Sequence, residues 1–260
     1  MTGKSSCGTS STHSPGHSDH CCCAHCEPER HQDVTAPLIS FADVDFDREH
    51  GQHILSGINL TVDHGDFLAI TGPNGGGKTT LLRLMLGLLK PTRGTISYYD
   101  AGGAPSKRPA FGYLPQKNSV DSRFPITVEE VVRSGLLADS ISRDRHNALI
   151  EKALEDVDLS DYASRPIGRL SGGQLQRALL ARAIVAERDI LVMDEPLSYI
   201  DVRFEEKLYG LIERLARKAT IILVSHQMSR IAGMANRHIL VDGTLTECCA
   251  RHHWFNPECS

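Results

Sequence analysis

Residues 67–80 read FLAITGPNGGGKTT, and this stretch decides the fold. The run from Phe67 to Thr71 predicts a buried strand, and the glycine-rich segment after it opens a helix that we predict over 78–89, closed by Pro91. The segment matches the Gly-x4-Gly-Lys-Thr pattern of phosphate-binding loops, in the strand, loop and helix setting that this pattern requires. The sequence therefore predicts a P-loop.

Each residue type in this loop has a chemical task. Glycines let the backbone wrap closely around phosphate, and the amide groups of a helix N-terminus attract its negative charge. Lys78 is expected to reach the terminal phosphates, and the Thr79 hydroxyl suits Mg²⁺. An ordinary glycine-rich turn is the alternative, but spacing and context both oppose it. We expect nucleotide phosphates to be bound by Gly72, Pro73, Asn74, Gly75, Gly76, Gly77, Lys78, Thr79 and Thr80.

Two acids follow an apolar run about a hundred residues later. Residues 190–193 read ILVM, which predicts a buried strand, and Asp194 and Glu195 stand at its end. A strand of this kind delivers carboxylates to the phosphate-binding edge of a parallel sheet. We expect Asp194 to hold Mg²⁺ and Glu195 to polarise an attacking water. A surface pair of acids at a strand end is the alternative, and the P-loop makes it the weaker one.

A second helix start carries phosphate-binding features. Ser171 and Gln174 stand at capping-box spacing, so a well-capped helix is the simplest interpretation. Gly172 and Gly173 lie between them, and glycines in a first turn weaken a helix. They are useful where phosphate approaches bare backbone at a helix end. We therefore expect Ser171, Gly172, Gly173 and Gln174 to contact a phosphate group as well.

The order of elements predicts an α/β fold with one main domain. Continuous apolar runs at 190–193 and 221–224, separated by a helix, favour a mostly parallel sheet around the P-loop core. Alternating runs at 38–44 and 54–62 predict an N-terminal antiparallel β-lobe, and residues of about 116–170 an inserted helical lobe. We expect a disordered tail over 1–36, the folded domain over 37–245 and a Cys/His-containing tail over 246–260.

Composition excludes several classes of function. A formal charge of −4 and a pI near 6.3 give no broad basic surface, so we expect no nucleic-acid partner. No apolar run approaches the roughly 18 residues that span a bilayer, and the polar N-terminus does not resemble a secretory signal. We expect a cytoplasmic chain, with any membrane crossing made by another subunit.

The cysteines lie outside the region of the motifs. All eight fall before residue 27 or after residue 247, so they cannot form disulfide bonds within the body of the domain. Thiolates and imidazoles cluster near the N-terminus, where Cys23 and Cys26 have zinc-site spacing. Side chains without any role are the alternative. We expect a zinc site formed by His20, Cys23, His25 and Cys26, and a weaker second cluster of Cys248, Cys249, His252, His253 and Cys259.

Taken in order, these motifs resemble those of the ABC-transporter ATPase family over roughly residues 38–245. The resemblance rests on the P-loop, Gln116, residues 170–174 (LSGGQ), residues 194–196 (DEP), Asp201 and His226. It implies an ATPase that uses ATP and Mg²⁺, with Glu195, His226, Gln116 and Lys78 in catalysis. In that family the residue resembling Gln116 contacts Mg²⁺ and the membrane partner, that resembling Asp201 lies at the dimer interface, and that resembling His226 contacts the γ-phosphate.

The resemblance also implies partners. Members of the family form head-to-tail dimers in which each ATP lies between one P-loop and the partner's LSGGQ segment, and membrane permease subunits contact the helical lobe. We therefore expect a peripheral protein on the inner face of the cell membrane. The family usually stacks an aromatic residue on adenine. That position is Glu49 here, or Phe46 if residues 47–50 are an insertion.

Three segments narrow the range of possible transported substrates. Residues 124–132, 174–183 and 196–201 resemble those of the zinc and manganese importer ATPases, which work with a permease and an extracytoplasmic metal-binding protein. Because thiolate and imidazole favour zinc over manganese, we expect zinc. Three alternatives stay open: a manganese or iron importer ATPase, a soluble ABC ATPase without a transport role, and a metal-sensing module that uses nucleotide as a switch.

Overall fold

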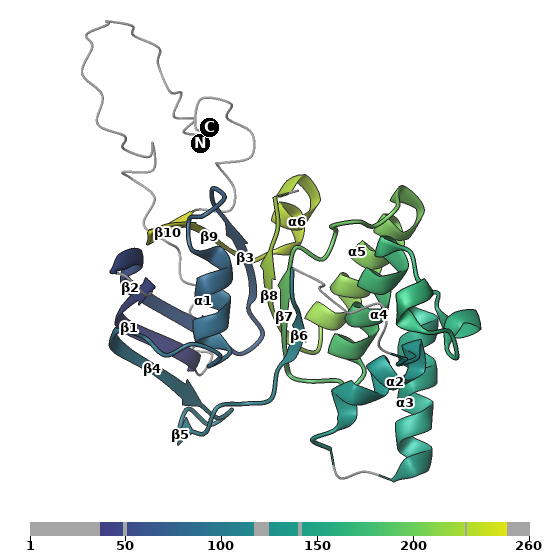
Figure 1. Ribbon diagram of the computed structural model, residues 1–260. Coiled ribbons are helices and arrows are strands. Elements are labelled where there is room, and N and C mark those ends of the chain that lie inside the picture. The colour runs from purple at the N-terminus through teal and green to yellow at the C-terminus, as the bar shows by residue number, and fades with distance from the viewer. Residues whose placement is uncertain (1–36, 49–50, 117–124, 140–141, 227, 249–260) are drawn as a thin grey trace, which may run out of the picture.

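The computed structural model describes residues 37–48, 51–116, 125–139, 142–226 and 228–248. Within them, two β-sheets lie on one side of the molecule and most of the helices on the other (Figure 1). The first sheet has the order β2-β1-β4-β5 and the second β10-β9-β3-β8-β7-β6. The α/β class and the N-terminal antiparallel sheet expected from the sequence are confirmed.

The larger sheet carries the P-loop. Its strands are β3 (Phe67–Thr71), β6 (Gly112–Leu114), β7 (Ile190–Asp194), β8 (Thr220–Val224), β9 (Arg237–Asp242) and β10 (Thr244–Cys248). Strands β6, β7, β8, β3 and β9 pair in parallel, and β10 pairs antiparallel with β9. The carboxyl ends of β3 and β7 therefore lie at the same edge, which brings the P-loop and the two acids together.

The central strands β3, β7 and β8 are buried on both faces, which explains their continuous apolar runs. Along β7, Ile190 and Val192 belong to one core cluster, whereas Leu191 and Met193 belong to the other. Helix α1 (Lys78–Met85) covers the first face, between this sheet and the antiparallel one. Its side chains pack with those of β1 (Pro37–Arg48), β2 (Gln52–Asp63) and β4 (Arg93–Tyr99). A short strand, β5 (Pro105–Ser106), ends that sheet.

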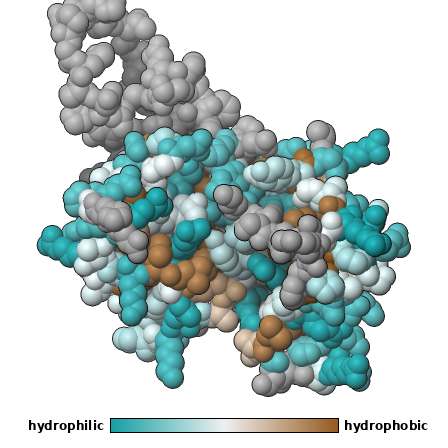
Figure 2. All heavy atoms as spheres, in the orientation of Figure 1, coloured by the Kyte–Doolittle hydropathy of each residue, from teal (hydrophilic) through white to brown (hydrophobic). Residues whose placement is uncertain are grey.

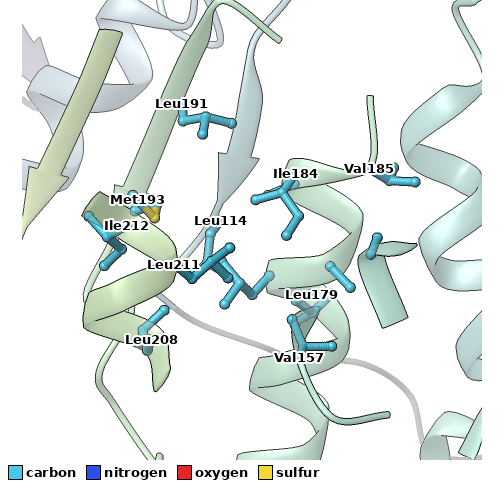
Figure 3. Packing of buried hydrophobic residues seen from close by; sticks show 14 of the residues in the cluster. Leu114, Val157, Leu179, Ile184, Val185, Leu191, Met193, Leu208, Leu211 and Ile212 are labelled. Carbon is cyan, nitrogen blue, oxygen red and sulfur yellow. The ribbon is translucent and has the colours of Figure 1, made fainter. Parts of the chain in front are cut away.

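Helices cover the second face. Helices α4 (Gly172–Ile184), α5 (Val202–Ala216) and α6 (Met228–Met234) lie against its strands, whereas α2 (Val128–Arg133) and α3 (Arg143–Asp156) pack on α4. There are 3₁₀ turns at Ser134–Leu136, Ser160–Tyr162 and Ile167–Arg169. Figure 3 shows Leu191 of β7 pointing toward Ile184 of α4, and Met193 of β7 beside Ile212 of α5, in one cluster. Helix α4 is thus anchored on the sheet below the edge that carries the P-loop and the two acids.

Three details differ from the sequence-based expectation or extend it. Helix α1 ends at Met85 rather than at residue 89, because Gly87 adopts a left-handed φ of 63° that interrupts the helix. Strand β10 continues to Cys248, beyond the expected domain end at residue 245. The expected capping box opens α2, where the Glu130 amide donates to Thr127 Oγ1 at 3.3 Å.

The surface in view is mostly hydrophilic. Figure 2 shows apolar side chains gathered in a few separate patches between charged and polar ones. Among the described helices, none is long and apolar enough to cross a membrane.

Candidate active site

The P-loop is closed from behind by β9 and β2. A Cβ on Gly72 would lie 2.0 Å from the Val241 carbonyl oxygen, and one on Gly76 would lie 2.7 Å from the same atom. A Cβ on Gly77 would lie 2.6 Å from Leu55 Cδ2, and Gly77 has a left-handed φ of 99°. Because no side chain fits at these positions, the loop backbone can pack closely against β9 and β2 and still curve around a phosphate group.

Lys78 lies across this loop. Its ammonium group donates hydrogen bonds to the carbonyl oxygens of Gly72 and Pro73, both at 2.8 Å. Burial lowers the pKa of Lys78 from its ordinary value, and the charges of Glu195 and Asp194 oppose that shift. The ammonium is therefore held on the side of the loop where a phosphate group can take over its hydrogen bonds.

Thr79 and Asp194 join the first helical turn to the end of β7. The Thr79 hydroxyl donates to Asp194 Oδ2 at 2.9 Å. Asp194 Oδ1 is buried and has no hydrogen-bond partner among the described residues. Burial raises the pKa of Asp194 above its ordinary value, opposed mainly by the Thr79 hydrogen bond and the Lys78 charge. An unbonded buried carboxylate oxygen beside a hydroxyl suits a hard cation such as Mg²⁺, so these residues fit the expected metal.

Glu195 and His226 meet at the ends of adjacent strands. Nε2 of His226 lies 3.3 Å from Glu195 Oε1, and the Glu195 side chain is only 8% exposed. Burial raises the pKa of the Glu195 carboxyl above its ordinary value, and the charge of His226 is the largest opposing influence. A carboxylate with a raised pKa is a stronger base, as water activation requires.

A cavity of about 270 Å³ joins these groups. Gln116, two residues after β6, also lines it. The full lining is Arg48, Gln52, Ile54, Asn74, Gly75, Gly77, Lys78, Thr79, Thr80, Gln116, Asp194 and His226. The P-loop, the Mg²⁺ candidates and His226 therefore share one cavity, with Glu195 beside His226.

One end of the cavity was not expected from the sequence. Arg48 pairs with Gln52 across the β1–β2 hairpin, and both line the cavity with Ile54. Phe46, a candidate for the adenine contact, packs instead against the core cluster between the sheets. The other candidate, Glu49, lies outside the described residues. The pairing of β1 with β2 shifts register between Phe46 and Asp47, just before Arg48, and alternation along the sequence does not indicate such a shift.

The LSGGQ segment and Asp201 lie elsewhere. None of Ser171, Gly172, Gly173, Gln174 or Asp201 is among the residues that line this cavity. Ser171 Oγ accepts a hydrogen bond from the Gln174 amide at 3.2 Å, which caps α4. Asp201 Oδ1 accepts one from the Phe204 amide at 3.0 Å, which caps α5. Among the described residues, the LSGGQ segment and Asp201 therefore form a set separate from the residues that line the cavity.

The expected zinc ligands lie outside the described residues. His20, Cys23, His25 and Cys26 precede residue 37, and Cys249, His252, His253 and Cys259 follow residue 248. Within the described part of the chain, no group of three or more His, Cys, Asp or Glu side chains is arranged to hold a metal ion.

Comparison with known sequences shows which proteins this chain is similar to. The sequence profile of the family described as "ABC transporter" matches residues 55–198. A "Probable metal transport system ATP-binding protein" of Chlamydia trachomatis is 43% identical, over 75% of this chain and 84% of the relative. The zinc uptake system ATP-binding protein ZurA of Listeria innocua is 37% identical, over 78% of this chain and 83% of the relative.

Solved structures show the same fold. The dimeric structure of a bacterial ABC transporter cassette has a TM-score of 0.73 at 26% identity, covering 82% of this chain and 99% of that one. A dimeric post-hydrolysis state of an ATP-binding cassette with bound ADP and phosphate has the same TM-score at 25% identity and the same coverage. The chain belongs to the ABC transporter family, in which it is an ATP-hydrolysing cassette.

Proposed function

We propose that this cassette powers the import of a divalent metal ion, zinc, through a membrane permease. The observation that carries the catalytic part is the meeting of the P-loop, Asp194, Glu195 and His226 at one edge of the sheet. Relatives named as metal-transport and zinc-uptake ATP-binding proteins support the substrate.

In the proposed reaction, water attacks the γ-phosphorus of ATP and the bond to the bridging oxygen of ADP breaks. The amides of the P-loop and the Lys78 ammonium bind the terminal phosphates, exchanging the loop carbonyls that Lys78 contacts for phosphate oxygens. Glu195 polarises the attacking water, and its raised pKa makes it a better proton acceptor. His226, beside that carboxylate, is placed to contact the γ-phosphate.

Thr79, Asp194 and Gln116 would hold Mg²⁺, which neutralises negative charge on the phosphate oxygens. Asp194 contributes the carboxylate oxygen that lacks a donor, and Thr79 its hydroxyl.

We infer that two copies act head to tail. Each LSGGQ segment would then contact the ATP held by the partner's P-loop, with Asp201 at the interface. The dimeric cassettes that share this fold support the arrangement. In the complete transporter the permease would contact the helical lobe of about residues 116–170, an extracytoplasmic protein would deliver the metal, and the cassette would lie on the cytoplasmic face of the membrane.

The N-terminal tail is proposed to bind zinc through His20, Cys23, His25 and Cys26, and to tune transport without being needed for hydrolysis. Deleting residues 1–36 leaves every ATPase motif in place, so basal turnover should survive while zinc content drops by about one ion per chain. Equilibrium dialysis of both forms measures this. Equal zinc content would contradict the site, and loss of all turnover would show that the tail belongs to the folded domain.

Metal-stimulated ATPase activity of the reconstituted transporter tests the substrate. Zinc should stimulate turnover more than manganese or iron at equal free concentration. Stronger stimulation by manganese or iron would indicate that this metal, and not zinc, is the substrate. Purification without any membrane subunit, and turnover unaffected by every metal, would favour a soluble ABC ATPase.

A further inference from the structure

Gln176 is a fully buried polar side chain in the second turn of α4, with 0% of its surface exposed. Its Nε2 donates a hydrogen bond to the Glu195 carbonyl oxygen at 3.4 Å. Burying an amide is unfavourable unless the amide is hydrogen-bonded, so an apolar residue would be the simpler choice in this core. The hydrogen bond links the helix that begins at the LSGGQ segment to the residue that is expected to activate water.

The backbone of Glu195 needs support from its neighbours. It has a left-handed φ of 56°, a conformation that is unfavourable for a residue with a side chain. Its amide donates to the Val224 carbonyl at 2.9 Å, and its carbonyl accepts from the Ser198 amide at 3.1 Å as well as from Gln176. Because φ sets the direction of the Cα–Cβ bond, these hydrogen bonds also set where the carboxylate points.

A second contact joins the same two segments. A Cβ on Gly173 would lie 2.7 Å from the Tyr199 carbonyl oxygen, so α4 begins directly against the segment that follows Glu195. Tyr199 is itself left-handed, with a φ of 65°. The first two turns of α4 therefore touch residues 195–199 at both ends of that segment.

We propose that Gln176 is a positioning residue for hydrolysis. By holding the Glu195 carbonyl it keeps the backbone left-handed and the carboxylate directed toward His226 and the nucleotide cavity. The contact also makes the orientation of Glu195 depend on the position of α4, whose N-terminus carries Ser171, Gly172 and Gly173. The inference rests on the proposed catalytic role of Glu195 and adds a residue that acts through it.

A purely structural role for Gln176 makes a different prediction. If the side chain only fills space, an apolar residue of similar length and volume should serve equally well. If it positions Glu195, that replacement should slow the chemical step while nucleotide binding and stability stay nearly unchanged. Gln176→Met distinguishes the two, because methionine retains the length but cannot donate the hydrogen bond. Leu179→Met, a volume-conserving change at another buried position of α4, is the matched control.

The experiment uses the purified full-length chain and measures kcat, the ATP dissociation constant and Tm for wild type, Gln176→Met, Leu179→Met and Glu195→Gln. We expect Gln176→Met to lower kcat about five- to tenfold, the scale of one net hydrogen bond, with ATP affinity and Tm close to those of Leu179→Met. If Gln176→Met does not fold, Gln176→Asn replaces it, because its amide is one methylene too short and the same loss confined to kcat is expected.

Two results would overturn the inference while leaving the proposed function intact. In both, Glu195→Gln is inactive. In the first, the Gln176 variant turns over within twofold of Leu179→Met. In the second, kcat, ATP affinity and Tm all fall together, which indicates packing alone. Near-normal turnover by Glu195→Gln would instead remove the catalytic role of Glu195, and the inference with it.

Discussion

The N-termini of α1 and α4 are both rich in glycine, but they are built differently. Helix α1 begins at a left-handed Gly77 without any side-chain cap, at the floor of a cavity. Helix α4 begins at Ser171, whose hydroxyl and the Gln174 side chain form a complete capping box away from that cavity. The N-terminus of α1 has no side-chain cap, so its first amides are left to be hydrogen-bonded by a ligand. The second is already a stable cap, and we expect it to meet a ligand held by another chain.

The largest expected effect falls on the catalytic edge beside α1. Glu195→Gln should retain ATP binding but reduce turnover at least about 10²-fold, because the phosphate cradle is intact while the proton acceptor is lost. The variant should accumulate as an ATP-bound dimer, detectable by size-exclusion chromatography. Glu151→Gln, an exposed position on α3, is the control and should behave as wild type. Near-normal turnover by Glu195→Gln would exclude this residue from catalysis.

Lys78→Ala tests whether the α1 end binds phosphate. The lost ammonium would contact the terminal phosphates before and during the reaction, so ATP affinity should fall about 10- to 100-fold, the scale of a charge-assisted hydrogen bond. Calorimetric titration of ATP measures the change. An unchanged dissociation constant would mean that the loop does not bind phosphate as proposed.

A matched pair of glycines compares the two helix ends directly. Gly76 and Gly173 each leave only 2.7 Å between an added Cβ and a backbone carbonyl oxygen, and neither has a left-handed φ. Gly76→Ala should weaken ATP binding about tenfold, because it distorts the cradle of the same chain. Gly173→Ala should leave ATP affinity of the isolated chain within about twofold and slow turnover instead.

Equal losses of ATP affinity in both glycine variants would contradict the proposal that only the α1 end binds ATP within a single chain. Measuring ATP binding at low protein concentration keeps the chains monomeric, so that the partner's contribution is absent. Turnover is then measured at high concentration on the same samples.

The smallest effect is expected at the end of the cavity lined by Arg48, Gln52 and Ile54, where we expect the adenine to bind. Arg48→Ala should weaken ATP binding about two- to fivefold, through loss of guanidinium packing over the base. Arg48→Lys keeps the charge but loses the planar group, and should resemble Arg48→Ala. Binding of inorganic tripolyphosphate, which has no base, should not change. Equal weakening of ATP and tripolyphosphate would show that Arg48 acts on the phosphates by charge alone.

The sequence predicts the P-loop end of α1 and the neighbouring acids well, because the patterns that indicate them are local. The run Phe67–Thr71, the glycines and Lys78 lie within a few residues of each other, and the apolar run before Asp194 marks a buried strand directly. The position of β9 beside β3 could not be predicted in this way, because it depends on parallel pairing between residues about 170 positions apart. Hydrophobic periodicity predicts a strand but does not indicate which distant strand it pairs with.

Two features of the site also escape sequence reasoning for physical reasons. Arg48 lines the cavity just after a register shift in the β1–β2 hairpin, and one residue of register decides which face a side chain occupies. The left-handed backbone of Glu195 is imposed by hydrogen bonds from Gln176 and Ser198 and by its own bond to Val224. Glutamate does not favour that conformation, so the residue type gives no hint of it.

The closure of the P-loop by β9 has a consequence for the synthesis of the chain. Val241 presses against Gly72 and Gly76, and the turn after it exchanges hydrogen bonds with both neighbours, from the Gly243 amide to the Gly76 carbonyl and from the Ser56 amide to the Gly243 carbonyl. A ribosome that has translated as far as His226 has made every residue lining the nucleotide cavity, but not the strand that holds the loop in shape. The growing chain therefore gains its nucleotide site only near the end of translation, and a product that terminates before β9 carries all the motifs without the cradle.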